Sequence, residues 1–266
     1  MSRSKLVLLV TAIAALALVG ARLVPARPAP SGASSARSGA DTAFVRIGSG
    51  ERTAGAFVAW PSGNQPVPAI VVAHEWWGLN GQIRDIARRL AQQGYAAIVP
   101  DLYHDKVADD PMRAHELMRG LEQDEALGTL SDAVAWLRSQ PRTAKGRIGA
   151  MGFCMGGGLA EQMGLNGAGV AAVVMFYGTP EPDSTRLARL AVPLQAHFGA
   201  QDEGIPAERV ESFRVALKKA GKITEVYVYP GAGHAFMHDG GSSYRPDAAR
   251  QAWARTLAFL QKHLKS

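Results

Sequence analysis

The chain has 266 residues, of which 47% are hydrophobic and 20% charged, and this balance excludes a disordered or low-complexity protein. Its single cysteine, Cys154, excludes an intramolecular disulfide and any multi-cysteine metal cluster. Residues 1–42 hold five of the 29 Lys and Arg but only one of the 23 Asp and Glu, so the rest of the chain carries a net charge of only +2. Without a basic stripe on that body, we expect no nucleic-acid partner.

The N-terminus has the pattern of a secretory signal. A basic start, MSRSK, precedes an apolar run over residues 6–20, which is shorter than the roughly 20 residues of a membrane-spanning helix. We therefore expect a signal peptide over 1–21, a Pro/Ala/Ser/Gly-rich flexible linker over 22–42 and one folded domain over 43–266. The protein is then exported, to the periplasm or beyond, as a monomer. An uncleaved, membrane-anchoring segment is the alternative.

Apolar strands alternate with helices along the predicted domain. Residues 43–48 and 54–60, separated by a turn-prone SGERT, indicate an antiparallel hairpin. Further strands are predicted at 67–75, 95–103, 147–154, 171–178, 193–200 and 224–231, and helices at 83–94, 111–139, 156–164, 206–221 and 246–264. This alternation predicts an α/β fold with a doubly wound, mostly parallel sheet and helices on both faces.

A glycine-rich turn stands where the strand 147–154 gives way to a helix. In Gly152-Phe-Cys154-Met-Gly156, glycines lie two residues before and two after the cysteine, which is the spacing of a nucleophile elbow. A thiol at a helix N-terminus has its anion favoured by the helix dipole and by a nearby imidazolium. An isolated cysteine would more often be a small buried hydrophobe, but the strand, elbow and helix context favours a nucleophile.

The same glycines could instead cradle a phosphate. The segment lacks the Lys-Ser/Thr pair of a P-loop and the full GxGxxG pattern of a dinucleotide site. We therefore expect no nucleotide and no dissociable cofactor.

A cysteine nucleophile needs a base and an orienting acid, and in hydrolases of this kind they follow it in the order acid, then histidine. Asp202 follows the strand 193–200, and His234 follows the last predicted strand. Both positions are carboxyl ends of strands, the edge at which open α/β sheets place their sites. We predict that His234 exchanges the proton and that Asp202 fixes its tautomer.

The other histidines have weaker claims to chemistry. His197 lies in an apolar strand and is expected to be a core residue, while His74-Glu75 is not followed by the second histidine of HExxH. His104, His115 and His263 have no partners at metal-ligand spacing, so no metal is expected.

Taken in order, the motifs HEWWGLN, GYAAIVPDLY, GxCxGG, GxxDxxxP and GxGHxF resemble those of the dienelactone hydrolase family of α/β-hydrolases over nearly all of residues 43–266. The resemblance implies an α/β-hydrolase fold and a triad of Cys154, Asp202 and His234. It also implies that Glu75 holds the resting thiol. Backbone N–H groups of Trp76 and Met155 would form the oxyanion hole.

The sequence departs from that family where a substrate carboxylate would bind. The family's Arg four residues after the catalytic histidine is replaced by His238, and Arg113 and Arg119 are near its second Arg without aligning cleanly. Other candidates for the substrate pocket are Trp77 and Phe236.

These observations predict an esterase or lactonase that forms an acyl-thioester on Cys154 from a small-molecule substrate. A redox or ligand-binding protein that uses Cys154 as a reactive thiol is the alternative. A membrane-tethered interaction module is a third hypothesis.

Overall fold

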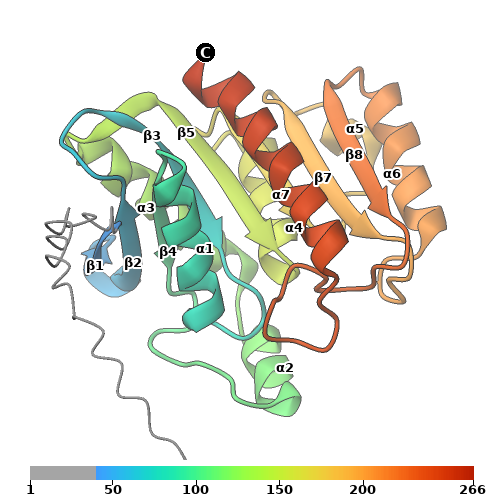
Figure 1. Cartoon of the computed structure of the whole chain (residues 1–266), viewed down its shortest axis with the longest axis horizontal. Coiled ribbons are helices and arrows are strands. Elements are labelled where there is room, and N and C mark those ends of the chain that lie inside the picture. The colour runs from blue at the N-terminus through green and yellow to red at the C-terminus, as the bar shows by residue number, and fades with distance from the viewer. Residues whose placement is uncertain (1–39) are drawn as a thin grey trace, which may run out of the picture. The chain divides into compact units, whose positions relative to one another are not determined.

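The computed structural model describes residues 40–266, which fold around one eight-stranded sheet (Figure 1). The predicted signal peptide, 1–21, lies outside the described residues, as does nearly all of the predicted linker, 22–42. The first strand begins at Asp41, so regular structure starts just inside the predicted linker. No helix within residues 40–266 is long and apolar enough to cross a membrane.

The sheet is mixed at one end and parallel through the rest. Its first two strands form the expected hairpin, and the second strand also pairs antiparallel with the strand Ala96–Pro100. All the other neighbours are parallel, which confirms the mostly parallel sheet. In spatial order the strands are β1 (Asp41–Ile47), β2 (Ala54–Trp60), β4 (Ala96–Pro100), β3 (Val67–Ala73), β5 (Thr143–Phe153), β6 (Ala172–Phe176), β7 (Leu194–Gly199) and β8 (Thr224–Tyr229).

Helices cover both faces of the sheet, as predicted. Figure 1 shows α1 (Gly81–Gln92) and α7 (Pro246–Leu260) in front of it, and α3 (Gln123–Ser139), α4 (Met155–Leu165) and α6 (Ala207–Lys219) behind it. The core is therefore split into two apolar layers. Successive residues of the central strands alternate between them, since Ile70 belongs to the layer under α1 and α7 and Val71 to the layer under α3 and α4.

The prediction of one long helix over 111–139 is wrong, because the chain forms two helices there. The helix α2 (Pro111–Arg119) ends before Gly120, and α3 begins at Gln123. Glycine in a helix interior lowers helix stability by about 1 kcal/mol relative to alanine. Asp124 and Glu125 suit the first turn of a new helix, because their negative charges lie at its positive dipole end. A short helix, α5 (Ser184–Leu187), was not predicted, and the terminal helix changes to a π-helical turn at Gln261–Lys265.

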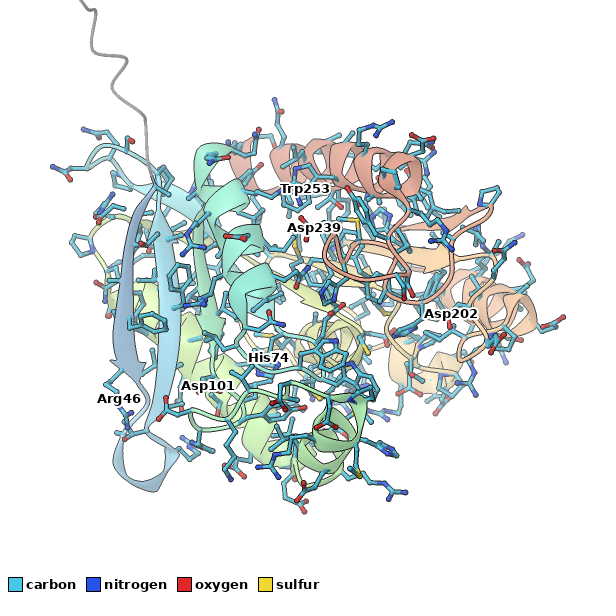
Figure 2. All side chains as sticks on the ribbon, turned by 60° about the horizontal axis from the view of Figure 1, so that its bottom comes forward. Arg46, His74, Asp101, Asp202, Asp239 and Trp253 are labelled. Carbon is cyan, nitrogen blue, oxygen red and sulfur yellow. The ribbon has the colours of Figure 1, made fainter. Side chains whose placement is uncertain are left out.

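The carboxyl ends of the parallel strands meet at the lower edge of the sheet in Figure 1, beside α2. Figure 2 turns this edge toward the viewer and labels His74, Asp101 and Asp202, which follow β3, β4 and β7. The loops after four of these strands carry the residues that the sequence analysis proposed for the site, namely Glu75, Cys154, Asp202 and His234. The topology therefore gathers them at one edge.

Candidate active site

Cys154 stands at the turn between β5 and α4 in a strained backbone conformation. Its φ of 54° and ψ of −120° lie in a region that non-glycine residues rarely adopt. The strain is held by backbone hydrogen bonds, since the N–H of Cys154 donates to the carbonyl of Phe176 and its own carbonyl accepts from Gly157. The thiol is consequently raised above the sheet at the N-terminus of α4.

The glycines around the cysteine are required by close backbone contacts. A Cβ on Gly152 would lie 1.9 Å from the carbonyl oxygen of Gly156, and a Cβ on Gly156 would lie 2.3 Å from that of Ala73. Gly158 differs, because its Cβ would meet only the carbonyl oxygen of Thr179, at 3.5 Å. Two of these three glycines therefore shape the elbow, and the third leaves space beside it.

His234 and Asp202 come together as predicted. The Nδ1 atom of His234 lies 2.7 Å from Oδ2 of Asp202, whose other oxygen accepts the N–H groups of Gly204 and Ile205. The Asp202 side chain is fully buried and firmly oriented. With Nδ1 used by Asp202, Nε2 is the ring nitrogen left for the thiol.

The pKa of His234 reflects these partners. Burial lowers it, but hydrogen bonds to Asp202 and Cys154 and the charges of both outweigh burial and raise the pKa from 6.5 to about 10. His234 therefore holds a proton more tightly than a free imidazole does. The backbone of the next residue, Ala235, has a φ of 58°, so strain occurs on this side of the site as well.

Two backbone N–H groups are available beside the thiol. Met155 is the first residue of α4, and the first N–H groups of a helix have no partner within it. The N–H of Trp76 has no backbone acceptor within the described part of the chain. Each could therefore donate to a developing oxyanion, as the family resemblance implies.

The loop that carries Trp76 is fixed by His74. The ring of His74 is buried, its Nδ1–H donates to the carbonyl of Glu75 at 2.6 Å, and its Nε2 accepts the N–H of Leu102 at 3.2 Å. Burial lowers the pKa of His74, which keeps the ring neutral with one donor and one acceptor. This histidine is a positioning residue for the loop.

Glu75 is nearly buried, and its hydrogen bonds differ from the expected contact with the resting thiol. The Tyr177 hydroxyl donates to Oε1 at 3.0 Å, and Nδ1 of His238 lies 3.1 Å from Oε2. These donors are stronger than S–H and occupy one carboxylate oxygen each. The hydrogen bond to Glu75 raises the pKa of His238 despite its partial burial. Glu75 thus acts on the site through its charge and through these two partners.

A cavity of about 460 Å³ opens over the thiol. Of the predicted pocket residues, Trp77 and His238 line it, together with Trp76, Cys154 and His234. The two Trp rings meet edge to face, with 5.2 Å between their centroids.

Three predicted pocket residues lie elsewhere. Phe236 is fully buried and packs edge to face against Tyr177, so its assignment to the pocket is wrong. On the exposed helix α2, Arg113 pairs with Glu116 and Arg119 is in the last turn. Neither arginine lines the cavity, and so His238 is its one titratable candidate for a substrate carboxylate within residues 40–266, besides His234.

The remaining histidines have structural environments. His197 is a core residue as predicted, with Nδ1 bonded to the Tyr229 hydroxyl and Nε2 to Gln195. His104 lies 3.0 Å from Glu125 at the surface. No group of three metal-ligating side chains occurs among the residues that the structure describes.

Sequence reasoning missed two residues at the site. Tyr177 follows β6 with a φ of 37° and reaches Glu75, and only the polar end of its apolar strand hints at this role. Met118 lines the cavity from α2, and nothing in the helical pattern distinguishes it from a packing residue.

The sheet order and the elbow between β5 and α4 define an α/β-hydrolase fold. The model of the dienelactone hydrolase family matches residues 54–264, and the chain belongs to this family. It is therefore a hydrolase that acts on ester or lactone bonds.

Individual relatives agree with this assignment. A protein of Methylorubrum extorquens named "Putative carboxymethylenebutenolidase" is 31% identical over 222 residues, covering 78% of this chain and 76% of the relative. One of the same name from Yersinia pestis is 33% identical, covering 78% and 83%. The crystal structure of a dienelactone hydrolase of Klebsiella pneumoniae, itself named as putative, superposes with a TM-score of 0.77 at 30% identity, covering 84% of this chain and 99% of that one.

The glycine contacts predict a difference in stability between two alanine variants. Gly156→Ala should lower the free energy of unfolding by about 1–3 kcal/mol, because the added Cβ meets backbone that cannot move aside. Gly158→Ala is the matched control in the same helix and should be neutral or stabilising by about 0.5–1 kcal/mol. Urea unfolding of both variants measures this. Equal losses would show that the close approach at Gly156 is not a constraint.

Proposed function

We propose that the protein hydrolyses uncharged carboxylic esters or lactones through an acyl-thioester on Cys154. The observation that carries the proposal is the contact of the buried Asp202 with His234, which lines the same cavity as the thiol of Cys154. An imidazolium next to sulfur favours the thiolate, which is the nucleophilic form.

The first half of the reaction makes the thioester. The thiolate of Cys154 attacks the carbonyl carbon, and the C=O electron pair moves to the oxygen, which the N–H groups of Trp76 and Met155 stabilise. As the tetrahedral species collapses, the bond to the alcohol oxygen breaks, and that oxygen takes the proton of His234. The alcohol leaves, and Cys154 holds the acyl group.

The second half of the reaction hydrolyses the thioester and regenerates the free enzyme. Acylation removes the negative charge of Cys154, which is one of the causes that raise the pKa of His234. The neutral imidazole then takes a proton from water, whose oxygen attacks the thioester carbon. The C–S bond breaks, the thiolate re-forms beside the imidazolium, and a carboxylic acid is released.

We also propose that the chain is exported, on the N-terminal pattern over 1–21. A start near residue 22 or 27, found by N-terminal sequencing of protein from its native cell, would support export. An intact Met1 in a membrane fraction would support an anchor instead. A monomer stays the expectation for its assembly.

Replacing the nucleophile tests the proposed chemistry. Cys154→Ala should reduce ester turnover to less than about a hundredth of the unmodified rate, because no acyl-enzyme can form. The residue is small and partly exposed, so the fold should survive, which circular dichroism checks. Intact mass spectrometry during turnover should show the acyl adduct on the unmodified chain alone. Higher residual activity would exclude Cys154 as the nucleophile.

The orienting acid has a matched neighbour for comparison. Asp202→Asn should lower kcat by at least about a hundredfold, because an amide can donate to His234 and select the wrong tautomer. Glu203→Gln, at the next position but exposed, should have little effect. Steady-state kinetics of the two purified variants decide. Reversed effects would show that the acid is wrongly assigned.

Substrate charge is the third test. An anion without a charged partner is costly to desolvate, so uncharged or aryl esters should be hydrolysed at least as well as carboxylate-bearing lactones of similar size. His238→Arg introduces a permanent cation at the cavity wall and should move the ratio of kcat/KM values toward the carboxylates. A strong preference of the unmodified enzyme for dienelactone would contradict the prediction.

A further inference from the structure

A second cavity, of about 290 Å³, adjoins the one above the thiol. The two share one lining residue, Met118, which projects from α2 and is half-buried. Cys154 lines the larger cavity, and its neighbour in the chain, Met155, lines the smaller. The tip of the elbow therefore lies between them, with Met118 as the common wall.

The break between α2 and α3 helps to build the smaller cavity. Met118 precedes Gly120, while Leu121 and Gln123 follow it, and all but the glycine line the space. The opposite wall comes from α4 and includes Gly158, the glycine whose missing side chain leaves room.

We propose that the smaller cavity binds the acyl chain of the ester and the larger one its alcohol, with Met118 setting the acyl length; this inference rests on the proposed function. The geometry of proton transfer gives the direction. His234 must protonate the departing alcohol oxygen, and among the two cavities it lines only the larger. The acyl substituent, on the other side of the carbonyl carbon, then extends past Met155.

The lining indicates which acyl groups fit. Met118, Leu121, Met155 and Leu159 are apolar, and the other side chains, those of Gln123, Gln162 and Thr179, are uncharged. An uncharged aliphatic chain therefore suits this lining, whereas a charged acyl group would lose its hydration there without meeting a charged partner.

The two methionines of this cavity differ in how firmly they are held. The sulfur of Met155 accepts a hydrogen bond from the Tyr103 hydroxyl at 3.4 Å, whereas no such bond holds Met118 within the described residues. Met118 is therefore the adjustable wall.

Two ester series separate the cavities. The first keeps a p-nitrophenol leaving group and lengthens the acyl chain from acetyl to decanoyl, and the second keeps acetyl and varies the alcohol. For each series we compare kcat/KM of the longest with that of the shortest member, using the full chain. Because both members of a ratio are measured on the same variant, a general loss of activity in that variant cancels.

Filling and opening the cavity should change the acyl ratio in opposite directions. Gly158→Leu should lower it by about tenfold or more, and Met118→Ala should raise it for long chains by a similar factor. Gly158→Leu should not change the alcohol ratio by more than about twofold, because Gly158 lines the smaller cavity and not the larger one. Met112→Ala, a matched control on α2 with 81% of the residue exposed, should leave both ratios unchanged. Gly158→Ala gives a smaller step in the same direction if the leucine variant does not fold.

The outcomes are distinguishable. A change in the alcohol ratio alone would reverse the assignment, and unchanged ratios in folded variants that turn over ester would refute it while leaving the proposed function intact. Absence of ester turnover and of an acyl-enzyme in the unmodified chain would refute both.

Discussion

The left-handed backbone at Cys154 depends on an approach of α4 to the ends of β3 and β5 that leaves no room for side chains at Gly152 and Gly156. The same approach places the start of α4 beside the loop that carries Trp76. Both proposed oxyanion donors are thus positioned by one packing contact, rather than by separate ones. Strain at the thiol is tolerated because the surrounding sheet, buried on both faces, fixes the conformation.

Two of the nearly buried carboxylates at this edge are each paired with a histidine. Asp202 is held by backbone N–H groups and faces His234, while Glu75 is held by Tyr177 and faces His238. A buried carboxylate is stable only when hydrogen-bonded or paired, and here each carboxylate raises the pKa of the histidine that faces it. Both histidines line the cavity over the thiol, and His234 also contacts the thiol itself.

The sequence was sufficient for features that depend on chain order and local pattern. The apolar strands, the glycine spacing around Cys154, and the polar residues at strand ends each have a cause within a few residues, and parallel pairing then gathers them. Features that depend on side-chain direction were not predictable in this way. Phe236, two residues after His234, points into the core, where its ring packs against those of Tyr177 and Tyr229. Met118 lines the site from the last turn of α2, a helix that the sequence pattern did not separate from the next one.

His238 links the electrostatics of the site to its choice of substrate. The hydroxyl of Tyr177 brings no charge, so His238, whose pKa is raised by the hydrogen bond to Glu75, is the partner of Glu75 on the cavity side that can carry a positive charge. A substrate carboxylate bound there would compete with Glu75 for His238, and one of the two carboxylates would lose its partner where little water solvates it. A neutral ester leaves the pair intact. Since the smaller cavity also has no charged lining residue, both ends of the substrate are expected to be uncharged, and the constraint comes from Glu75 as much as from the space itself.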